Sequence, residues 1–268
     1  MPEAPRSSRH WLERVRSLRD RAAREREGVC YVEGIRQVLS AVEGGHTLDA
    51  LLVDPTRLKS DVAWQNVADM RARDVEYVEL SSAEFARISS RDNPVGIAAI
   101  VRWSARPLAE LEPTMDCLYL VADDIRDPGN LGTLVRSLDA AGGTAIIVHS
   151  GTDLGHPTAL RASLGTTFHV PAYRADSLDD VFALAQYHSI LTVATSANAA
   201  TNLWDTIFTR PAAIFAGNEG RGLTPATIAR CDLRVSIPML GTATSLNVSV
   251  ATGIILYEVA RQGGTRDG

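Results

Sequence analysis

Three polar loops, each following an apolar strand-like run, hold the residues of this 268-residue chain that are best suited to chemistry. The first runs from Asp127 to Ser137. It contains Arg136 and Asn130, and we expect Asn130 to cap a helix that begins at Leu131. A helix N-terminus beside an arginine can bind phosphate. An ordinary capped helix with a solvated arginine would give the same pattern, so this loop alone leaves both interpretations open.

The second loop, Gly217–Leu223, has three glycines in six positions, which lets a ligand approach the backbone closely. Its glycine spacing fits neither the Walker loop nor the GxGxxG dinucleotide motif. Glu219 within it would repel a phosphate group. The loop therefore favours a ligand that carries hydroxyl, amine or sulfonium groups.

The third loop leads from Ile237 into an unusually apolar helix, which we expect over Ser245–Arg261. Ser245 could be the N-cap of this helix, and Asn247 and Ser249 could be satisfied by their own backbone. Taken alone, that structural interpretation is the better one.

The elements that must position these loops alternate in type. In the second half of the chain the apolar runs are Cys117–Ala122, Thr144–Val148, Phe168–Pro171, Ile190–Thr195, Ala212–Ala216 and Leu233–Ile237. Short apolar runs separated by helical stretches predict an α/β fold with a mostly parallel sheet covered on both faces. Ligands bind such sheets at the carboxyl ends of the strands, where all three loops begin.

The first half predicts a smaller α/β domain. A helix is expected over residues 9–26, with Leu12, Val15, Leu18 and Ala22 on one face. Further helices are expected at 35–42, at 61–73 and from Ser81, whose spacing to Glu84 fits a capping box. The expected strands are 29–32, 48–53, 75–79 and 95–101. A proline-containing linker at 104–115 would separate this domain (1–103) from the second (116–268).

Composition excludes several classes of protein. With 45% hydrophobic and 22% charged residues, the chain is ordinary for a globular protein. No apolar run approaches the ~20 residues of a membrane helix, and the N-terminus lacks an apolar leader, so we expect a cytoplasmic protein. Cys30, Cys117 and Cys231 are too widely spaced for a disulfide framework or a cysteine-based zinc site. Histidines and acids share no spacing, so we expect no metal.

The net charge of −5 hides a basic N-terminus. Residues 1–27 carry eight arginines against five acids, and every basic residue of the chain except Lys59 is arginine. A basic segment on an acidic protein hints at RNA or DNA contact. Genomic base composition and a solvated helix explain the same pattern, so its role stays open.

In order, spacing and attachment to strands, the three loops together resemble the motifs of the SpoU/TrmH family. These are RNA ribose 2′-O-methyltransferases of the SPOUT superfamily. Asn130 to Arg136 resembles the first motif, Gly217–Leu223 the second, and Ile237–Met239 with Ser245–Ser249 the third. The N-terminal domain is similar to the small substrate-binding domain of the family, through Val32–Ile35 and Gly96–Ala98.

The resemblance implies S-adenosylmethionine as cofactor and a deep trefoil knot in the C-terminal sheet, a rare connectivity. The cofactor-binding residues that it implies are Thr195, Gly217, Ile237, Met239 and Leu246. The catalytic residues that it implies are Asn130, Arg136, Glu219, Ser245 and Asn247. Because an arginine side chain stays protonated in proteins, Arg136 is better suited to stabilising charge on the 2′-oxygen than to acting as a base.

The resemblance also implies a homodimer built on the C-terminal domain, with the apolar helix as the interface. A separate N-terminal domain favours 23S rRNA as the substrate over tRNA, and some relatives protect producers of a ribosome-targeting antibiotic, so resistance is an alternative to a housekeeping role. Two other readings stay open, a tRNA ribose methyltransferase and a non-catalytic RNA-binding protein. A dinucleotide oxidoreductase is excluded because no GxGxxG follows an early strand.

Overall fold

The computed structural model describes residues 7–73, 75–196 and 199–263 and divides into two compact units. The first unit comprises the chain up to Ser104 together with Gly155–His169. The second comprises Ala105–Leu154 and the chain from Val170 onwards. The sequence did not predict that a segment from the middle of the chain returns to the first unit.

The first unit is built on a four-stranded mixed sheet. Its strands are β1 (Val29–Glu33), β2 (Leu48–Val53), β3 (Tyr77–Glu79) and β4 (Ile97–Arg102). Their order is β1-β4-β2-β3, with β4 antiparallel to both neighbours and β3 parallel to β2. The helices are α1 (Ser8–Ser17), α2 (Arg21–Glu27), α3 (Ile35–Glu43), α4 (Asp61–Arg71), α5 (Ser82–Ile88) and α7 (Pro157–Ala162).

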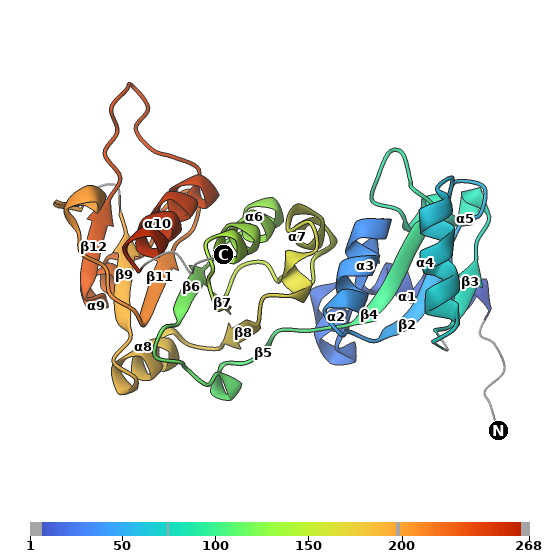
Figure 1. The fold of residues 1–268 in the computed structure, drawn as a ribbon, viewed down its shortest axis with the longest axis horizontal. Helices are drawn as coiled ribbons and strands as arrows, with labels where there is room; N and C mark the ends of the chain where they lie inside the picture. Colours follow the sequence, from blue (N-terminus) through green and yellow to red (C-terminus); the bar gives the residue numbers. More distant parts are fainter. Residues whose placement is uncertain (1–6, 74, 197–198, 264–268) are drawn as a thin grey trace. The chain divides into compact units, whose positions relative to one another are not determined.

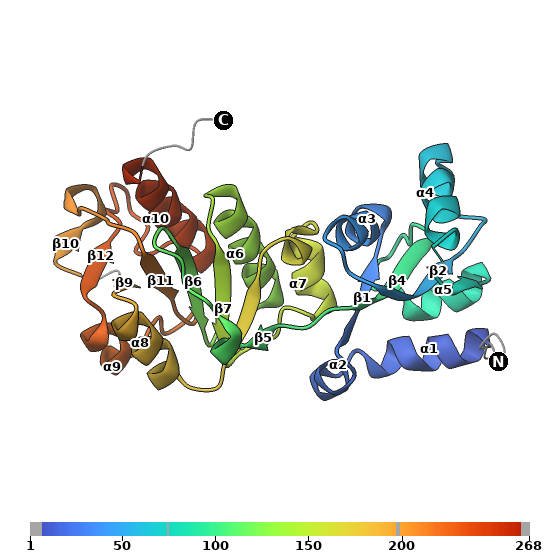
Figure 2. The same ribbon diagram turned by 60° about the horizontal axis from the view of Figure 1, so that its bottom comes forward.

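Alternate residues of each strand supply two separate cores. Cys30 and Val32 face α3 and α4, whereas Val29 and Tyr31 lie in the core formed with α1 and α5 (Figures 1 and 2). Both faces of the sheet are therefore covered, and α7 packs along β1 at the edge. The capping box predicted at Ser81 is confirmed, with both of its hydrogen bonds present.

The basic N-terminal segment belongs to the core. Asp20 caps α2 through the Ala22 backbone, so the single helix expected over residues 9–26 is two helices. Trp11 and Leu18 are almost fully buried. Ala22, expected on the same face, is exposed because the chain changes direction between α1 and α2. A deletion of this segment would therefore remove part of the core.

Most of the arginines described in that segment are already occupied. Arg14 pairs with Glu27 at 3.0 Å and with Asp49 at 2.7 Å. The buried Arg24 donates to the carbonyls of Leu18 and Arg19, at 2.7 and 2.9 Å. These groups hold the helices in place rather than forming a free basic arm.

The second unit is built on an eight-stranded sheet in the order β10-β12-β9-β11-β6-β7-β8-β5, and every pairing is parallel. Its strands are β5 (Arg106–Pro107), β6 (Leu118–Asp123), β7 (Ala145–His149), β8 (Ala172–Ala175), β9 (Leu191–Thr195), β10 (Thr201–Asn202), β11 (Ala212–Ala216) and β12 (Leu233–Ser236). The prediction of a mostly parallel sheet is confirmed.

Helices cover both faces of this sheet. They are α6 (Pro128–Ala140), α8 (Leu178–Tyr187), α9 (Pro225–Arg230) and α10 (Val248–Gln262). α6 and α10 pack side by side on one face, while α8 and α9 lie on the other (Figures 1 and 2). Phe182 of α8 stacks on Phe215 of β11, with ring centroids 5.0 Å apart.

Two expectations for this half of the chain are corrected. The strand expected at Phe168–Pro171 lies instead at Ala172–Ala175, because Phe168 closes a short 3-10 helix (Thr166–Phe168) and is buried in the first unit. A short apolar run does not distinguish a strand from a buried turn. The segment expected as a linker contains β5, and its Leu108 and Leu111 enter the core of the second unit.

Among the described residues, no helix combines the length and the apolar character that crossing a membrane requires.

Candidate active site

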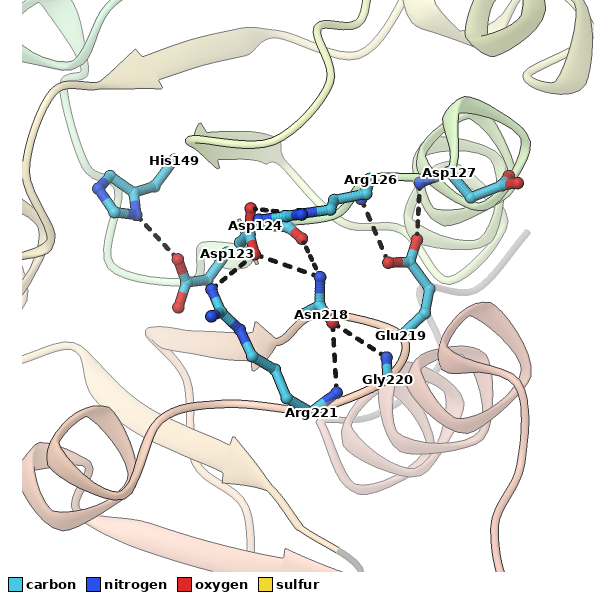
Figure 3. Close-up of polar contacts among 9 residues, drawn as sticks. All are labelled: Asp123, Asp124, Arg126, Asp127, His149, Asn218, Glu219, Gly220 and Arg221. Carbon is cyan, nitrogen blue, oxygen red and sulfur yellow. Dashed lines mark hydrogen bonds and ion pairs between the residues drawn. The ribbon is translucent and has the colours of Figure 1, made fainter.

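The loops that follow β6 and β11 meet through one carboxylate. These strands are neighbours in the sheet, so their carboxyl ends lie side by side. Glu219 accepts hydrogen bonds from the backbone N–H groups of Arg126 and Asp127, at 3.2 and 3.0 Å (Figure 3). It also accepts one from the Asn130 side chain at 3.1 Å. Glu219 thus joins the first polar loop to the second.

The α6 N-terminus is closed by the protein's own acids. The N-cap is Asp127, which accepts from the Asn130 backbone at 2.8 Å, so the prediction that Asn130 caps a helix from Leu131 is wrong. Carboxylates are stabilised at a helix N-terminus by its unpaired N–H groups and dipole. Asp127 uses the Asn130 N–H of the first turn, and Glu219 uses the two N–H groups just before α6, so carboxylates occupy part of the phosphate corner expected there.

The ionised form of Glu219 is favoured by these contacts. Partial burial opposes ionisation, but hydrogen bonds outweigh it and lower the pKa of Glu219. They come from its own backbone N–H, the Asp127 N–H, the Asn130 amide and the Arg126 N–H. Glu219 is a hydrogen-bond acceptor with its oxygens in use. It is therefore suited to positioning the first loop.

The third loop joins the same network through Asn247. Its side chain donates to Asn130 Oδ1 at 2.9 Å, and the Ser249 hydroxyl donates to the Asn130 carbonyl at 3.0 Å. Asn247 also caps α10 by accepting from the Ser249 backbone at 2.8 Å. Glu219, Asn130 and Asn247 thus form one hydrogen-bonded chain across all three loops, which we call the clamp.

Ser245 lies outside the clamp. It is not the cap of the last helix, because that helix begins at Val248 with Asn247 as its cap. Ser245 is exposed and, among the residues described, makes no hydrogen bond. The structure therefore gives it no partner in the site.

Arg136 is also apart from the clamp. It lies on α6 six residues after Asn130, and a helix of 3.6 residues per turn separates two such side chains by about 120°. It is exposed, and within the described part of the chain it makes no hydrogen bond or ion pair. Its guanidinium is available to an anion from outside the chain.

A second polar cluster braces the glycine-rich loop. Asn218 donates to the Asp124 carbonyl at 3.0 Å and accepts from the Gly220 and Arg221 backbones (Figure 3). The Arg221 side chain pairs with Asp124 at 2.7 Å. Asp124 adopts a left-handed backbone with φ of 53°, which few non-glycine residues do. The sequence analysis missed Asp124 and Arg221, although the first follows a strand directly.

His149 and Asp123 form a further pair that the sequence analysis missed. They end the adjacent strands β7 and β6, and His149 Nδ1 lies 2.8 Å from the Asp123 carboxylate (Figure 3). Their position at the carboxyl ends of two strands could have identified them from the sequence, because polar residues there face the loops.

The residues expected to bind the cofactor divide into a tightly packed part at the strand ends and an open part in the third loop. Gly217 is tightly packed, because a Cβ there would lie 2.3 Å from the Leu223 backbone nitrogen. Thr195 is fixed as well, since its hydroxyl donates to the Phe215 carbonyl at 3.2 Å. Ile237 is half-buried at the end of β12.

The open part is the long loop between β12 and α10, which projects from the sheet in Figure 1. Met239 is 36% and Leu246 37% exposed, and Leu240 between them is almost wholly exposed. Among the described residues, no backbone hydrogen bond holds this loop from Met239 to Leu246. Exposed apolar side chains beside free backbone groups fit a ligand with an adenine ring and polar edges.

Among the described residues, no group of three or more histidine, cysteine or acidic side chains is arranged to hold a metal ion.

Comparison with known protein families gives two matches. Residues 117–257 match the model of the SpoU rRNA Methylase family. Residues 12–99 match an MRM3-like substrate binding domain.

Individual relatives extend over nearly the whole chain. A 23S rRNA (uridine(2479)-2'-O)-methyltransferase of Streptomyces viridochromogenes is 33% identical over 91% of this chain and 87% of its own. The 23S rRNA (guanosine(2553)-2'-O)-methyltransferase RlmP of Bacillus subtilis is 28% identical over 91% and 93%. The crystal structure of the SpoU methyltransferase AviRb from Streptomyces viridochromogenes with AdoMet superimposes with a TM-score of 0.86. It is 32% identical and covers 96% of this chain and 98% of the other.

Proposed function

Because this chain belongs to the SpoU rRNA methylase family, we propose that it methylates a ribose 2′-hydroxyl of 23S rRNA, with S-adenosylmethionine as methyl donor. The observation that carries the proposal is the clamp. Glu219, Asn130 and Asn247 come from three separate loops and converge at the carboxyl edge of the sheet. The relatives supply the substrate class, since both are named for 23S rRNA 2′-O-methylation.

The free groups around the clamp divide the chemistry between them. S-adenosylmethionine, when bound, supplies a methyl group on a positively charged sulfur. Accepting that methyl group would require the ribose 2′-hydroxyl to lose its proton, so the chain must position this oxygen and stabilise its developing negative charge. Arg136 binds an RNA phosphate and stabilises the negative charge that develops on the oxygen. A guanidinium stays protonated in proteins and cannot take the proton, which passes to solvent.

The clamp residues act mainly by position. Asn130 orients the ribose, while Glu219 and Asn247 hold Asn130 through both ends of its amide. Transfer needs the reacting atoms within about 3–3.5 Å, so fixing the loops supplies much of the rate. Ser245, which is exposed on the open loop, borders the cofactor residues Met239 and Leu246.

The cofactor residues line the neighbouring strand ends. Gly217 lets the glycine-rich loop fold back tightly on its own backbone at the end of β11, while Thr195 ends β9 and Ile237 directly follows the neighbouring strand β12. Met239 and Leu246 cover the adenosine from the open loop. Their exposure in the structure is the feature that supports this role.

We also propose that the enzyme acts as a homodimer through α10. This helix presents Val250, Ile254 and Tyr257 at helical spacing, with Val250 52% and Tyr257 55% exposed. An exposed apolar stripe of this kind marks an interaction surface. A second copy would bring further groups to the site, where Arg136 has no partner within its own described chain.

A transfer assay with labelled cofactor on separated 23S rRNA, 16S rRNA and tRNA tests the function. We expect label in 23S rRNA alone, at one ribose that nuclease mapping then identifies. Label in tRNA alone would contradict the proposed substrate, and no label in any RNA would contradict the proposed activity. The trefoil knot, the cytoplasmic location and a role in antibiotic resistance stay predictions.

Light scattering tests the dimer. We expect a dimer at micromolar concentration, and a monomer without activity for Val250→Asp. Val62→Asp is the matched control, since Val62 is an exposed valine of the first unit. A wild-type monomer that methylates RNA at the full rate would contradict the dimer.

A further inference from the structure

A hollow in the first unit carries features that the methyl-transfer site does not use. Its volume is about 330 Å³, within the range of small-molecule pockets. The apolar wall is formed by Val15, Leu18, Ile88 and Pro157. Arg19 and Ser90 stand among its polar residues, and Tyr31 lies on the wall beside them. We call this hollow the Tyr31 pocket.

The Tyr31 hydroxyl is the unusual group of this pocket. Tyr31 is only 4% exposed, and its hydroxyl is buried without a hydrogen-bond partner among the described residues. Buried polar groups are nearly always hydrogen-bonded, because leaving one unpaired is costly. A phenylalanine would fill the same space without that cost. A tyrosine here is explained if its hydroxyl bonds a ligand.

The charges around Tyr31 favour an anionic ligand. A second, smaller hollow shares Tyr31, Ser90 and Pro157 with the first and is lined by Arg91 and Arg161. Arg161 is exposed and has no side-chain partner in the described chain. The buried Nε of Arg91 makes no hydrogen bond among the described residues, although it lies 4.0 Å from the Glu33 carboxylate. The one carboxylate there, Glu33, is already bonded by Ser89 and the Ser90 backbone, at 2.7 and 3.0 Å.

The Tyr31 hydroxyl keeps its proton in this setting. Burial, and then the nearby Glu33 carboxylate, raise the pKa of Tyr31. It can therefore donate to a ring nitrogen or a carbonyl oxygen at neutral pH. An apolar wall, one fixed donor and arginines at the rim match a nucleobase with its attached phosphate, because proteins read unpaired RNA bases through packing and edge hydrogen bonds.

We infer that the Tyr31 pocket binds one unpaired nucleotide of the RNA substrate, apart from the ribose that is methylated. The inference rests on the proposed function and deepens it. The base would lie against Leu18 and Pro157 and accept a hydrogen bond from Tyr31, with its phosphate beside Arg161. The pocket would then select the RNA by a loop or bulge, while the clamp holds the reacting ribose.

Binding of unmodified 23S rRNA transcript to the full-length protein at two salt concentrations tests the inference. Tyr31→Phe should weaken binding about threefold to tenfold, the scale of one hydrogen bond. Arg161→Gln should reduce the slope of log affinity against log salt by about 0.7–0.9. The matched controls are Tyr77→Phe and Arg73→Gln, because both residues lie in the first unit and line neither hollow.

Ultraviolet crosslinking gives a second reading. Digestion of the wild-type complex should yield a nucleotide adduct on a peptide that contains Tyr31 or residues 156–158. Thr158→Trp, which fills the pocket from its half-buried rim, should remove the adduct. Val62→Trp, at an exposed site elsewhere in the unit, should not.

The outcomes separate the two proposals. Unchanged RNA affinity in Tyr31→Phe, an unchanged salt slope in Arg161→Gln and no adduct would overturn the pocket while methyl transfer persists. If the crosslinked peptide carried another protein or free cofactor and no RNA nucleotide, the proposed role of the Tyr31 pocket would also be overturned. A wild-type protein that binds the RNA but transfers no methyl group would overturn the proposed function and leave the pocket standing.

Discussion

The clamp in the second unit and the Tyr31 pocket in the first treat polar groups in opposite ways. In the clamp, Glu219, Asn130 and Asn247 satisfy one another. In the pocket, the Tyr31 hydroxyl is buried without a partner, and Arg161 is exposed without one in the described chain. A satisfied network fixes geometry, whereas an unsatisfied group is available for a ligand.

The same contrast divides the candidate active site. Among the described residues, the Arg136 side chain makes no hydrogen bond and the loop from Met239 to Leu246 makes no backbone hydrogen bond, although the family resemblance grouped both with the clamp. Substitutions in the clamp should therefore reduce stability as well as turnover. Substitutions of the free groups should change binding or turnover and leave stability alone.

The largest expected effect is at Arg136. Arg136→Ala should lower methyl transfer at least ~10²-fold, the scale seen when a preorganised charge-stabilising group is removed. Its melting temperature and its affinity for S-adenosylmethionine should match the wild type, because Arg136 has no partner in the described chain to lose. Single-turnover rates and calorimetry measure both quantities.

Asp139→Ala is the control for that experiment, since Asp139 is another exposed charge on α6. It should transfer methyl groups at the wild-type rate. A fully active Arg136→Ala enzyme would show that Arg136 is not needed for methyl transfer. A lowered melting temperature would show that Arg136 stabilises the fold, and either result would contradict the contrast between the clamp and Arg136.

The next effect is at Asn130. Asn130→Ala deletes the bonds to Glu219 and Asn247 together and should destabilise the protein by about 1–2 kcal/mol. Turnover should fall as well, because both neighbouring loops lose their tie. Urea unfolding measures the stability. In a double-mutant cycle with Glu219→Ala the two losses should not add, since the residues share one hydrogen bond. Strict additivity would mean that they act separately.

A smaller effect should appear on acidification. The folded state lowers the pKa of Glu219 from its ordinary 4.5, so its contribution to stability is present above that value and is lost as pH falls through the folded pKa. Below pH 4.5 the melting temperature of the wild type should therefore decline more steeply than that of Glu219→Gln, which carries no charge to lose. Parallel curves would show that the carboxylate charge is not what the clamp uses.

Periodicity and turn chemistry were enough to predict most of the architecture. The strand predicted at Ala212–Ala216 has its predicted bounds, and that at residues 48–53 does as well. Both runs end at abrupt polar or glycine positions, so their bounds are sharp in the sequence. The break at Asp20 was missed because the apolar spacing continues across it.

For the candidate site, the sequence alone placed three polar loops after strand-like runs. The resemblance to the SpoU/TrmH family, and not periodicity, grouped Asn130, Glu219 and Asn247. Their hydrogen bonds could not be predicted, because several side chains can compete for the same backbone N–H groups. At the start of α6, Asp127 and Glu219 accept from these groups. The Tyr31 pocket left no signal, because its wall combines residues of α1, β1, α5 and α7 that lie far apart in sequence.

The smallest expected effect is on the stability of Tyr31→Phe. Removal of a buried hydroxyl without a partner should not destabilise the fold, and should raise the free energy of unfolding by up to about 1 kcal/mol. The same variant is expected to bind RNA less well, so stability and binding move in opposite directions, which a purely structural tyrosine cannot produce. Tyr77→Phe, on a half-buried ring that lies under Arg71, should change neither quantity. Urea unfolding of the three proteins at neutral pH measures the difference. A clear loss of stability in Tyr31→Phe would show that the hydroxyl has a partner in solution, and the contrast between clamp and pocket would then disappear.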